Sequence, residues 1–278
     1  MINLLLAIAT SAMVSIVMRT SEKYIRNNIS MLCVNYMMCV ILANYYTGIG
    51  KISFGEKGMQ SAVFMGILSG FLYLFSFVFL QLNIRRNGVV LSATFMKLGV
   101  LVPTIMSVVF FKERLELLQL TGFCIALFAI VLINFEKGQQ SASFKTGLVI
   151  LLLGGGGADA MSKIFEQLGD INYEDYFLYF TFIAALILCI LFAVFKKQKL
   201  HVTDILFGLL LGIPNYLSAR FLLKALSTVP AVITYPTYSV ATIVVVSVAG
   251  IVIFKEKPSR KQKSAIAMIL VSLVLLNI

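Results

Sequence analysis

The chain has 278 residues, of which 60% are hydrophobic and only 13% are charged. Soluble domains carry about 25% charged residues, and a chain of this length cannot hide so much apolar surface in a soluble core, so the composition excludes a soluble globular protein. The formal net charge of +11 does not indicate nucleic-acid binding, because the lysines and arginines cluster between apolar runs, where they act on membrane topology.

Ten apolar runs, each close to the length of a membrane-spanning helix, follow one another along the chain. A spanning helix needs about 20 mostly apolar residues, because its backbone must satisfy its own hydrogen bonds within hydrocarbon. The sequence therefore predicts an all-α membrane protein with ten transmembrane helices. The runs lie approximately at 2–18, 30–47, 59–82, 88–111, 117–135, 146–166, 175–195, 203–226, 230–254 and 261–277.

The segments that flank the runs indicate how the chain enters the membrane. The first run is followed by Arg19, Glu22 and Lys23 rather than by a cleavage site, so we interpret it as a retained helix and not a signal peptide. If loops alternate between the two sides, one side receives most of the basic residues, which places that side in the cytoplasm and both termini outside. The other side receives only Lys51, Lys57, Lys112 and Arg114.

All four cysteines lie inside predicted helices, with neither CxxC spacing nor a nearby histidine. We interpret them as small buried hydrophobic residues, with a disulfide or a metal site as the alternative, and we expect no cofactor. The four are Cys33, Cys39, Cys124 and Cys189.

Several runs carry polar side chains at helical spacing, so each set shares one face of its helix. Such faces suit a polar cavity, and the tyrosines among them suit an aromatic or amphipathic ligand, although tyrosines also join helices as plain packing contacts. In chain order the sets are Ser11 and Ser15; Ser69, Tyr73 and Ser76; Thr94, Lys97, Thr104 and Ser107; Asn215 and Ser218; and Tyr235, Tyr238, Ser239 and Thr242.

Charged side chains near the middle of apolar runs are the strongest functional signal. An ionised lysine at the bilayer centre costs about 2.5 to 3.5 kcal/mol on insertion scales, so Lys97 should face a partner or water. Asp159, in the sixth run, is the candidate partner. Arg220 and Lys224 form an i, i+4 pair in the eighth run, where they either face the same cavity or extend to the interface.

Four consecutive glycines, at 154–157, lie just before Asp159 in the sequence. Their missing Cβ atoms allow either close approach of a neighbouring helix or local unwinding that would expose backbone groups to a ligand. The run is not a phosphate-binding loop, because the GxxxxGK[ST] spacing is absent.

A short motif recurs at the same place in each half of the chain. Phe111-Lys112-Glu113 ends the fourth run, and Phe254-Lys255-Glu256 ends the ninth. An odd number of spans in each half predicts two inverted repeats, at 1–137 and 138–278, with a substrate site near the midplane. Chance recurrence of three letters at a membrane exit is the alternative.

The segments around these motifs resemble an EamA-type repeat of the drug/metabolite transporter superfamily. The first half offers Val102-Pro103-Thr104 and Phe111 to Arg114, and the second offers Tyr235 to Tyr238 and Phe254 to Lys257. The resemblance implies two inverted five-helix repeats around a central cavity, lined mainly by the first, third, fourth, sixth, eighth and ninth helices. Five of these helices carry the polar sets described above, and the sixth helix carries Asp159.

We therefore expect a secondary active carrier that moves a small polar or amphipathic metabolite or drug by alternating access. Lys97 and Arg220 would bind an anionic group, whereas Asp159 would bind a cationic group or carry a coupling proton. Substrate-contact candidates are Lys97, Asp159, Arg220, Asn215, Tyr235, Tyr238, Tyr73, Thr94, Ser11 and Ser15. A permanent ion pair between Lys97 and Asp159 is the competing interpretation.

Other classes fit the sequence less well. A channel would gather rings of charge by oligomerisation, and an intramembrane enzyme would show HExxH or Gly-x-Ser-x-Gly, neither of which occurs. We expect no enzymatic activity, a bacterial inner membrane as the location, and a monomer or homodimer as the assembly.

The predicted topology can be tested with a reporter fused after Ile278. A periplasmic reporter enzyme should be active and a cytoplasmic one inactive, because the basic loops hold the opposite side in the cytoplasm. The reverse pattern would contradict the predicted orientation.

Overall fold

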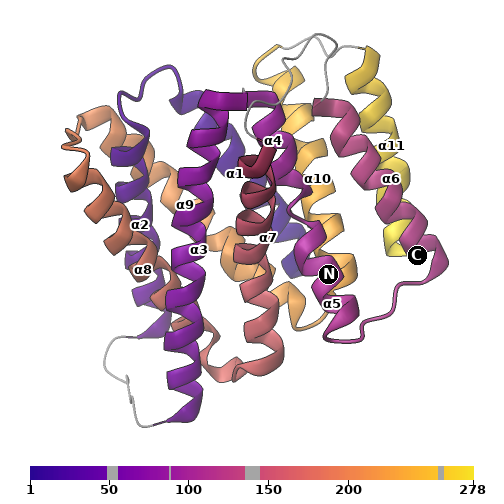
Figure 1. Cartoon of the computed structure of the whole chain (residues 1–278), viewed down its shortest axis with the longest axis horizontal. Helices are drawn as coiled ribbons and strands as arrows, with labels where there is room; N and C mark the ends of the chain where they lie inside the picture. Colours follow the sequence, from indigo (N-terminus) through magenta and orange to yellow (C-terminus); the bar gives the residue numbers. More distant parts are fainter. Residues whose placement is uncertain (49–55, 88, 135–144, 256–259) are drawn as a thin grey trace. The chain divides into compact units, whose positions relative to one another are not determined.

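The structure, a computed structural model, describes residues 1–48, 56–87, 89–134, 145–255 and 260–278, and these residues form helices joined by short connections (Figure 1). Within the described residues, each predicted apolar run lies largely on a helix, and the fourth is divided between two helices. The helices are α1 (Ile2–Ser21), α2 (Asn28–Thr47), α3 (Lys57–Asn87), α4 (Val89–Leu98), α5 (Leu101–Val109), α6 (Leu117–Asn134), α7 (Lys145–Leu168), the 3-10 turn η1 (Ile171–Tyr173), α8 (Glu174–Phe195), α9 (Val202–Leu226), α10 (Ala231–Val252) and α11 (Arg260–Asn277).

Seven helices in the described part of the chain are long and apolar enough to cross a membrane. They belong to α1, α2, α3, α7, α8, α9 and α10. Three shorter apolar helices, Phe95–Val109, Leu117–Leu132 and Lys263–Asn277, fall on the remaining predicted runs. The all-α membrane class is confirmed, and the count of ten spans stays a prediction.

The described helices pack into two compact units that interleave along the sequence. Unit 1 consists of residues 1–74 and 164–227, and unit 2 of residues 75–163 and 228–278. Two boundaries fall inside α3 and α7 and the third falls between α9 and α10, and each unit takes helices from both halves of the chain. The predicted repeats, 1–137 and 138–278, are a different division, and that division stays a prediction.

Small residues bring the helices of unit 1 close together. Helix α9 packs along α1 and α2, and α2 packs along α8. Gly208 and Gly212 face α2, where a Cβ added at Gly208 would lie 2.6 Å from the carbonyl oxygen of Met31. Gly66 and Gly70 of α3 contact the backbone of α8 in the same way. Small residues four apart let backbones approach in a membrane, where packing contacts drive helix association.

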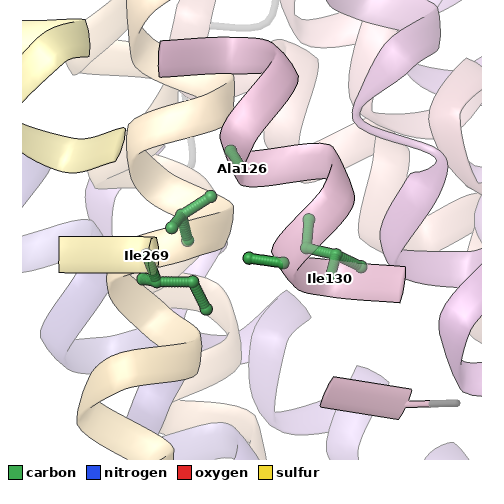
Figure 2. Close-up of a cluster of buried hydrophobic side chains, with 5 residues drawn as sticks. Ala126, Ile130 and Ile269 are labelled. Carbon is green, nitrogen blue, oxygen red and sulfur yellow. The ribbon is translucent and has the colours of Figure 1, made fainter. Parts of the chain in front are cut away.

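The apolar core of unit 2 lies where α6, α10 and α11 meet. Helix α6 packs along α11, and α10 contacts both. Figure 2 shows Ala126 and Ile130 of α6 opposite Ile269 of α11. Ala129 and Val240 complete the buried cluster, which therefore joins helices from both halves of the sequence.

The fourth predicted helix is broken between α4 and α5, and Pro103 accounts for the break. In a regular helix Pro103 would leave the carbonyl of Gly99 without its donor, and the proline ring would collide with that carbonyl. The chain instead forms tighter bonds three residues apart, from Val100 N to Lys97 O (3.4 Å) and from Val102 N to Gly99 O (2.9 Å). Helix α4 therefore ends one residue after Lys97.

The four-glycine run lies inside α7, which stays helical throughout. A Cβ added at Gly156 would lie 2.2 Å from the carbonyl oxygen of Gly99 and 2.6 Å from the Cβ of Val102. At Gly155, by contrast, an added Cβ would have nothing within 4 Å. The prediction of close helix approach is confirmed, and the alternative of unwinding at these glycines is wrong, because the break lies in the neighbouring helix.

Substitution of Gly156 by alanine should lower the stability of the protein. The new methyl group would press on the backbone at Gly99, and overpacking of this kind costs about 1–3 kcal/mol. Gly155→Ala is the matched control, since its methyl group meets open space and alanine favours the helix by about 1 kcal/mol. Thermal unfolding in detergent should give a lower midpoint for Gly156→Ala alone, and equal midpoints for the two variants would contradict the packing at the break.

Candidate functional site

Two charged residues of α7, Asp159 and Lys163, define the candidate site of unit 2. They are four residues apart and therefore lie on the same face of the helix. The Nζ atom of Lys163 lies 2.8 Å from Oε1 of Glu113, and the Lys163 side chain is only 2% exposed. Lys163 also lies over the ring of Phe111, with its Nζ atom 5.7 Å from the ring centroid. Its charge is thus neutralised by a residue of the repeated motif.

Glu113 holds a second helix as well. Its Oε2 accepts a hydrogen bond of 2.9 Å from the backbone N–H of Val232, in the first turn of α10. A carboxylate at a helix N-terminus is favoured, because the first N–H groups lack partners within the helix. Glu113 therefore links α7 to α10 through one ion pair and one charge-assisted hydrogen bond.

The backbone has the same uncommon conformation at the lysine of both copies of the motif. Lys112 has φ = 54° and Lys255 has φ = 53°. Both values lie in the left-handed region, which residues other than glycine rarely adopt. Each lysine follows the phenylalanine of its motif, so the two copies share an uncommon local conformation. Glu256, the counterpart of Glu113, lies outside the described residues.

Tyr235 of α10 contacts the backbone beside the buried acid. Its hydroxyl donates a hydrogen bond of 2.6 Å to the carbonyl oxygen of Asp159, and its side chain is 2% exposed. This hydrogen bond uses the backbone carbonyl of Asp159 and not its side chain. Asp159 is partly exposed, and its carboxylate is left for other contacts. Tyr235 and Glu113 thus hold α10 against α7 at two levels.

Lys97 lies in the last turn of α4, where the carbonyl end of the helix dipole favours a cation. Its side chain is exposed, and its charge interacts electrostatically with the carboxylate of Asp159. In the described part of the chain, Lys163, Arg220 and Lys224 form ion pairs with acidic residues, but no ion pair within 4 Å joins Lys97 to Asp159. Opposite charges are therefore held near each other, at the helix break, without direct contact.

Unit 1 contains a separate cluster of polar and aromatic groups around Arg220. The guanidinium donates to both carboxylate oxygens of Asp175, at 2.9 and 3.1 Å, and stacks 3.6 Å from the ring centroid of Tyr46. Arg–carboxylate pairs with two parallel hydrogen bonds are among the strongest polar contacts in proteins. Asn215 donates a hydrogen bond of 3.2 Å to Asn35. These contacts join α9 to α2 and α8.

The structure thus brings together three of the predicted site residues, Lys97, Asp159 and Tyr235, in unit 2. Tyr238 lies in the same unit on α10, half-buried, and the side chain of Thr94 lies outside the described part. The other candidates belong to unit 1. Of these, Ser15 donates to the backbone of Ser11 at 3.3 Å, a contact within α1. The remaining members of that group are Arg220, Asn215 and Tyr73.

Sequence reasoning missed the partners of the basic residues. Glu113 was visible only as part of a repeated motif, and Asp175 only as the start of an apolar run. A buried lysine or arginine requires an acid, but the sequence does not say which one.

Among the described residues, no three histidine, cysteine, aspartate or glutamate side chains gather as a metal site would require.

Comparisons with known proteins bear on the family and on the fold. Residues 149–278 match the EamA-like transporter family. Over 271 residues the chain is 22% identical to a protein of Haemophilus influenzae described as "Uncharacterized protein", with 93% of this chain and 91% of that protein covered. A solved crystal structure has the same fold, with a TM-score of 0.74 at 14% identity and coverage of 99% of this chain and 98% of its own.

The family match confirms the EamA-type resemblance over residues 149–278 and indicates a transporter family rather than an enzyme family. Together with the seven long apolar helices, it identifies a multi-pass integral membrane protein.

Removal of the Glu113 charge should destabilise unit 2 strongly. Glu113→Gln leaves the Lys163 ammonium buried without its partner, and breaking a buried pair in this way costs about 3–5 kcal/mol. The double variant Glu113→Gln, Lys163→Met should recover most of the loss, because no uncompensated charge remains.

Lys224→Met is the matched control. It removes a lysine that is 36% exposed and pairs with Glu174 at 3.5 Å, where we expect a loss of about 1 kcal/mol or less. Thermal midpoints in detergent report all three variants. A double variant no more stable than Glu113→Gln would refute the assigned ion pair.

Proposed function

We propose that this multi-pass membrane protein, whose residues 149–278 match the EamA-like transporter family, is a secondary active carrier for a small polar or amphipathic metabolite. The observation that carries the proposal is the placement of Lys97 beside the α4–α5 break and of Asp159 on α7, within electrostatic reach but without an ion pair between them. The carrier would alternate access between the two sides of the membrane.

The energetic cost of these charges supports a functional role. An ionised side chain at the centre of a spanning helix costs about 2.5–3.5 kcal/mol on insertion scales. Lys163 and Arg220 offset that cost with direct acidic partners. Lys97, by contrast, makes no such contact in the described part of the chain. A substrate that supplies the missing contact would bind at this point.

Each residue has a distinct part in this proposal. The ammonium of Lys97 donates hydrogen bonds to an anionic or carbonyl group of the substrate, and the carboxylate of Asp159 accepts from a cationic or hydroxyl group. Tyr235, bonded to the carbonyl of Asp159, acts as a positioning residue that keeps this carboxylate in place. Protonation of Asp159 would weaken its attraction for both Lys97 and a cationic group, which supplies a route to proton coupling.

Inverted repeats support alternating access, because two related halves can exchange conformations across the membrane. The shared left-handed lysines at 112 and 255 favour this construction. A bacterial inner membrane and a monomer or homodimer remain part of the proposal. Arg220 has its ion pair with Asp175, so we assign substrate contact first to Lys97 and Asp159.

Transport by the purified protein in vesicles tests the proposal. A thermal-shift screen of amino acids, nucleosides, sugars, phosphorylated metabolites and cationic drugs would first supply a ligand. Lys97→Ala and Asp159→Asn should each lower its saturable uptake about tenfold or more, which corresponds to about 1.4 kcal/mol of lost interaction. Arg114→Ala, on an exposed loop residue, is the control and should transport normally.

Proton coupling has its own readout in the same vesicles. An imposed pH gradient should accelerate uptake by the wild type and leave Asp159→Asn unchanged. Normal saturable uptake in both charge variants would remove Lys97 and Asp159 from the mechanism. Unitary currents instead of saturation would favour a channel.

A further inference from the structure

Two cysteines that are far apart in sequence meet inside unit 1. The Cys33 thiol, on α2, donates a hydrogen bond to Sγ of Cys189, on α8, at a sulfur–sulfur distance of 3.2 Å. Cys189 is buried and Cys33 is partly exposed. Neither cysteine takes part in the transport site proposed above.

The separation of the two sulfurs suits a disulfide better than a bridging metal. A disulfide bond is about 2.0 Å long, so closure needs the sulfurs to approach by about 1 Å. Two thiolates on a zinc ion would each lie about 2.3 Å from the metal, and a structural zinc needs four ligands. The described residues offer no third or fourth ligand from histidine, cysteine, aspartate or glutamate.

Neighbouring contacts keep the two sulfurs facing each other. Asn27, just before α2, is hydrogen-bonded through its side chain to Gln198, just after α8. Ser30 donates a hydrogen bond of 3.1 Å to the carbonyl of Lys199. Cys33 follows one turn later on α2. The start of α2 and the end of α8 are therefore held together independently of the thiols.

We propose that Cys33 and Cys189 form a redox modification site, which closes reversibly into a disulfide that joins α2 to α8. The oxidant is a low-molecular-weight disulfide. The Cys33 thiolate attacks one of its sulfurs and releases one thiol, and the Cys189 thiolate then attacks Sγ of Cys33 and releases the second. The two protein thiols lose two protons and two electrons, which the reagent takes up as two thiols.

The predicted topology gives the site its context. Cys33 lies about 8 Å along α2 from its first residue, and Cys189 lies at a similar depth from the last residue of α8. The basic loops that we predict to be cytoplasmic adjoin these two helix ends. The cytoplasmic glutathione pool is reducing, so the pair rests as two thiols and closes when that pool becomes oxidised. Closure would then fix α2 against α8 and limit the motions open to unit 1.

Oxidised glutathione acting on the full-length purified protein in detergent tests the site. After treatment, free thiols are alkylated under denaturing conditions and the digest is analysed by mass spectrometry. We expect a linked peptide pair containing Cys33 and Cys189 that dithiothreitol separates, and a higher thermal midpoint for the oxidised protein. Cys39 and Cys124 should appear in no internal disulfide.

Two variants complete the experiment. Cys33→Ala should abolish the linked peptide and the midpoint shift, whereas Cys124→Ala, at an exposed cysteine, should keep both. The primary readout uses the wild type and so does not depend on the folding of any variant. Full alkylation of Cys33 and Cys189 after oxidation, or a disulfide that pairs Cys33 with Cys39 or Cys124, would overturn the proposal.

Discussion

The close backbone contact between Gly99 and Gly156 is the interaction on which the rest of unit 2 depends. Pro103 prevents the Gly99 carbonyl from taking part in a regular helix, and the absent side chain at Gly156 lets α7 approach that carbonyl. Because the two backbones meet there, Lys97 and Asp159, each a few residues from the contact, come within electrostatic reach. A larger residue at Gly156 would separate them. The contact therefore connects a local rule of helix geometry to the chemistry of the site.

Buried charges in both units obey the same physical requirement. A charge without a partner is costly in a low-dielectric environment, and Lys163 and Arg220 accordingly have acids within 3 Å. Each acid lies on a different segment from its base: Glu113 lies in the connection between α5 and α6, and Asp175 lies on α8. Glu113 also binds the first turn of α10. Against this background Lys97, which makes no ion pair in the described part of the chain, is distinctive, and a substrate is the partner that we propose for it.

Much of the fold could be predicted from the sequence, because apolar runs in a membrane have almost no alternative to the helix. The break at Gly99 was also predictable, since Pro103 lies four residues later, although we used that proline only as part of a motif. The partners of Lys163 and Arg220 could not be predicted, because Glu113 and Asp175 are each about 45 to 50 residues away along the chain and only packing brings them close. The same holds for the interleaved units, because two of their boundaries fall inside the apolar helices α3 and α7, where the sequence carries no local signal.

The central claim is that Lys97 and Asp159 contact the transported molecule and are not permanent partners of each other. An experimental structure of the protein in a lipid nanodisc, determined by electron cryo-microscopy with and without a ligand from the screen, tests it most directly. We predict ligand density within hydrogen-bonding distance of both the Lys97 ammonium and the Asp159 carboxylate. An ion pair between these two groups in both structures, with the ligand bound elsewhere, would contradict the account.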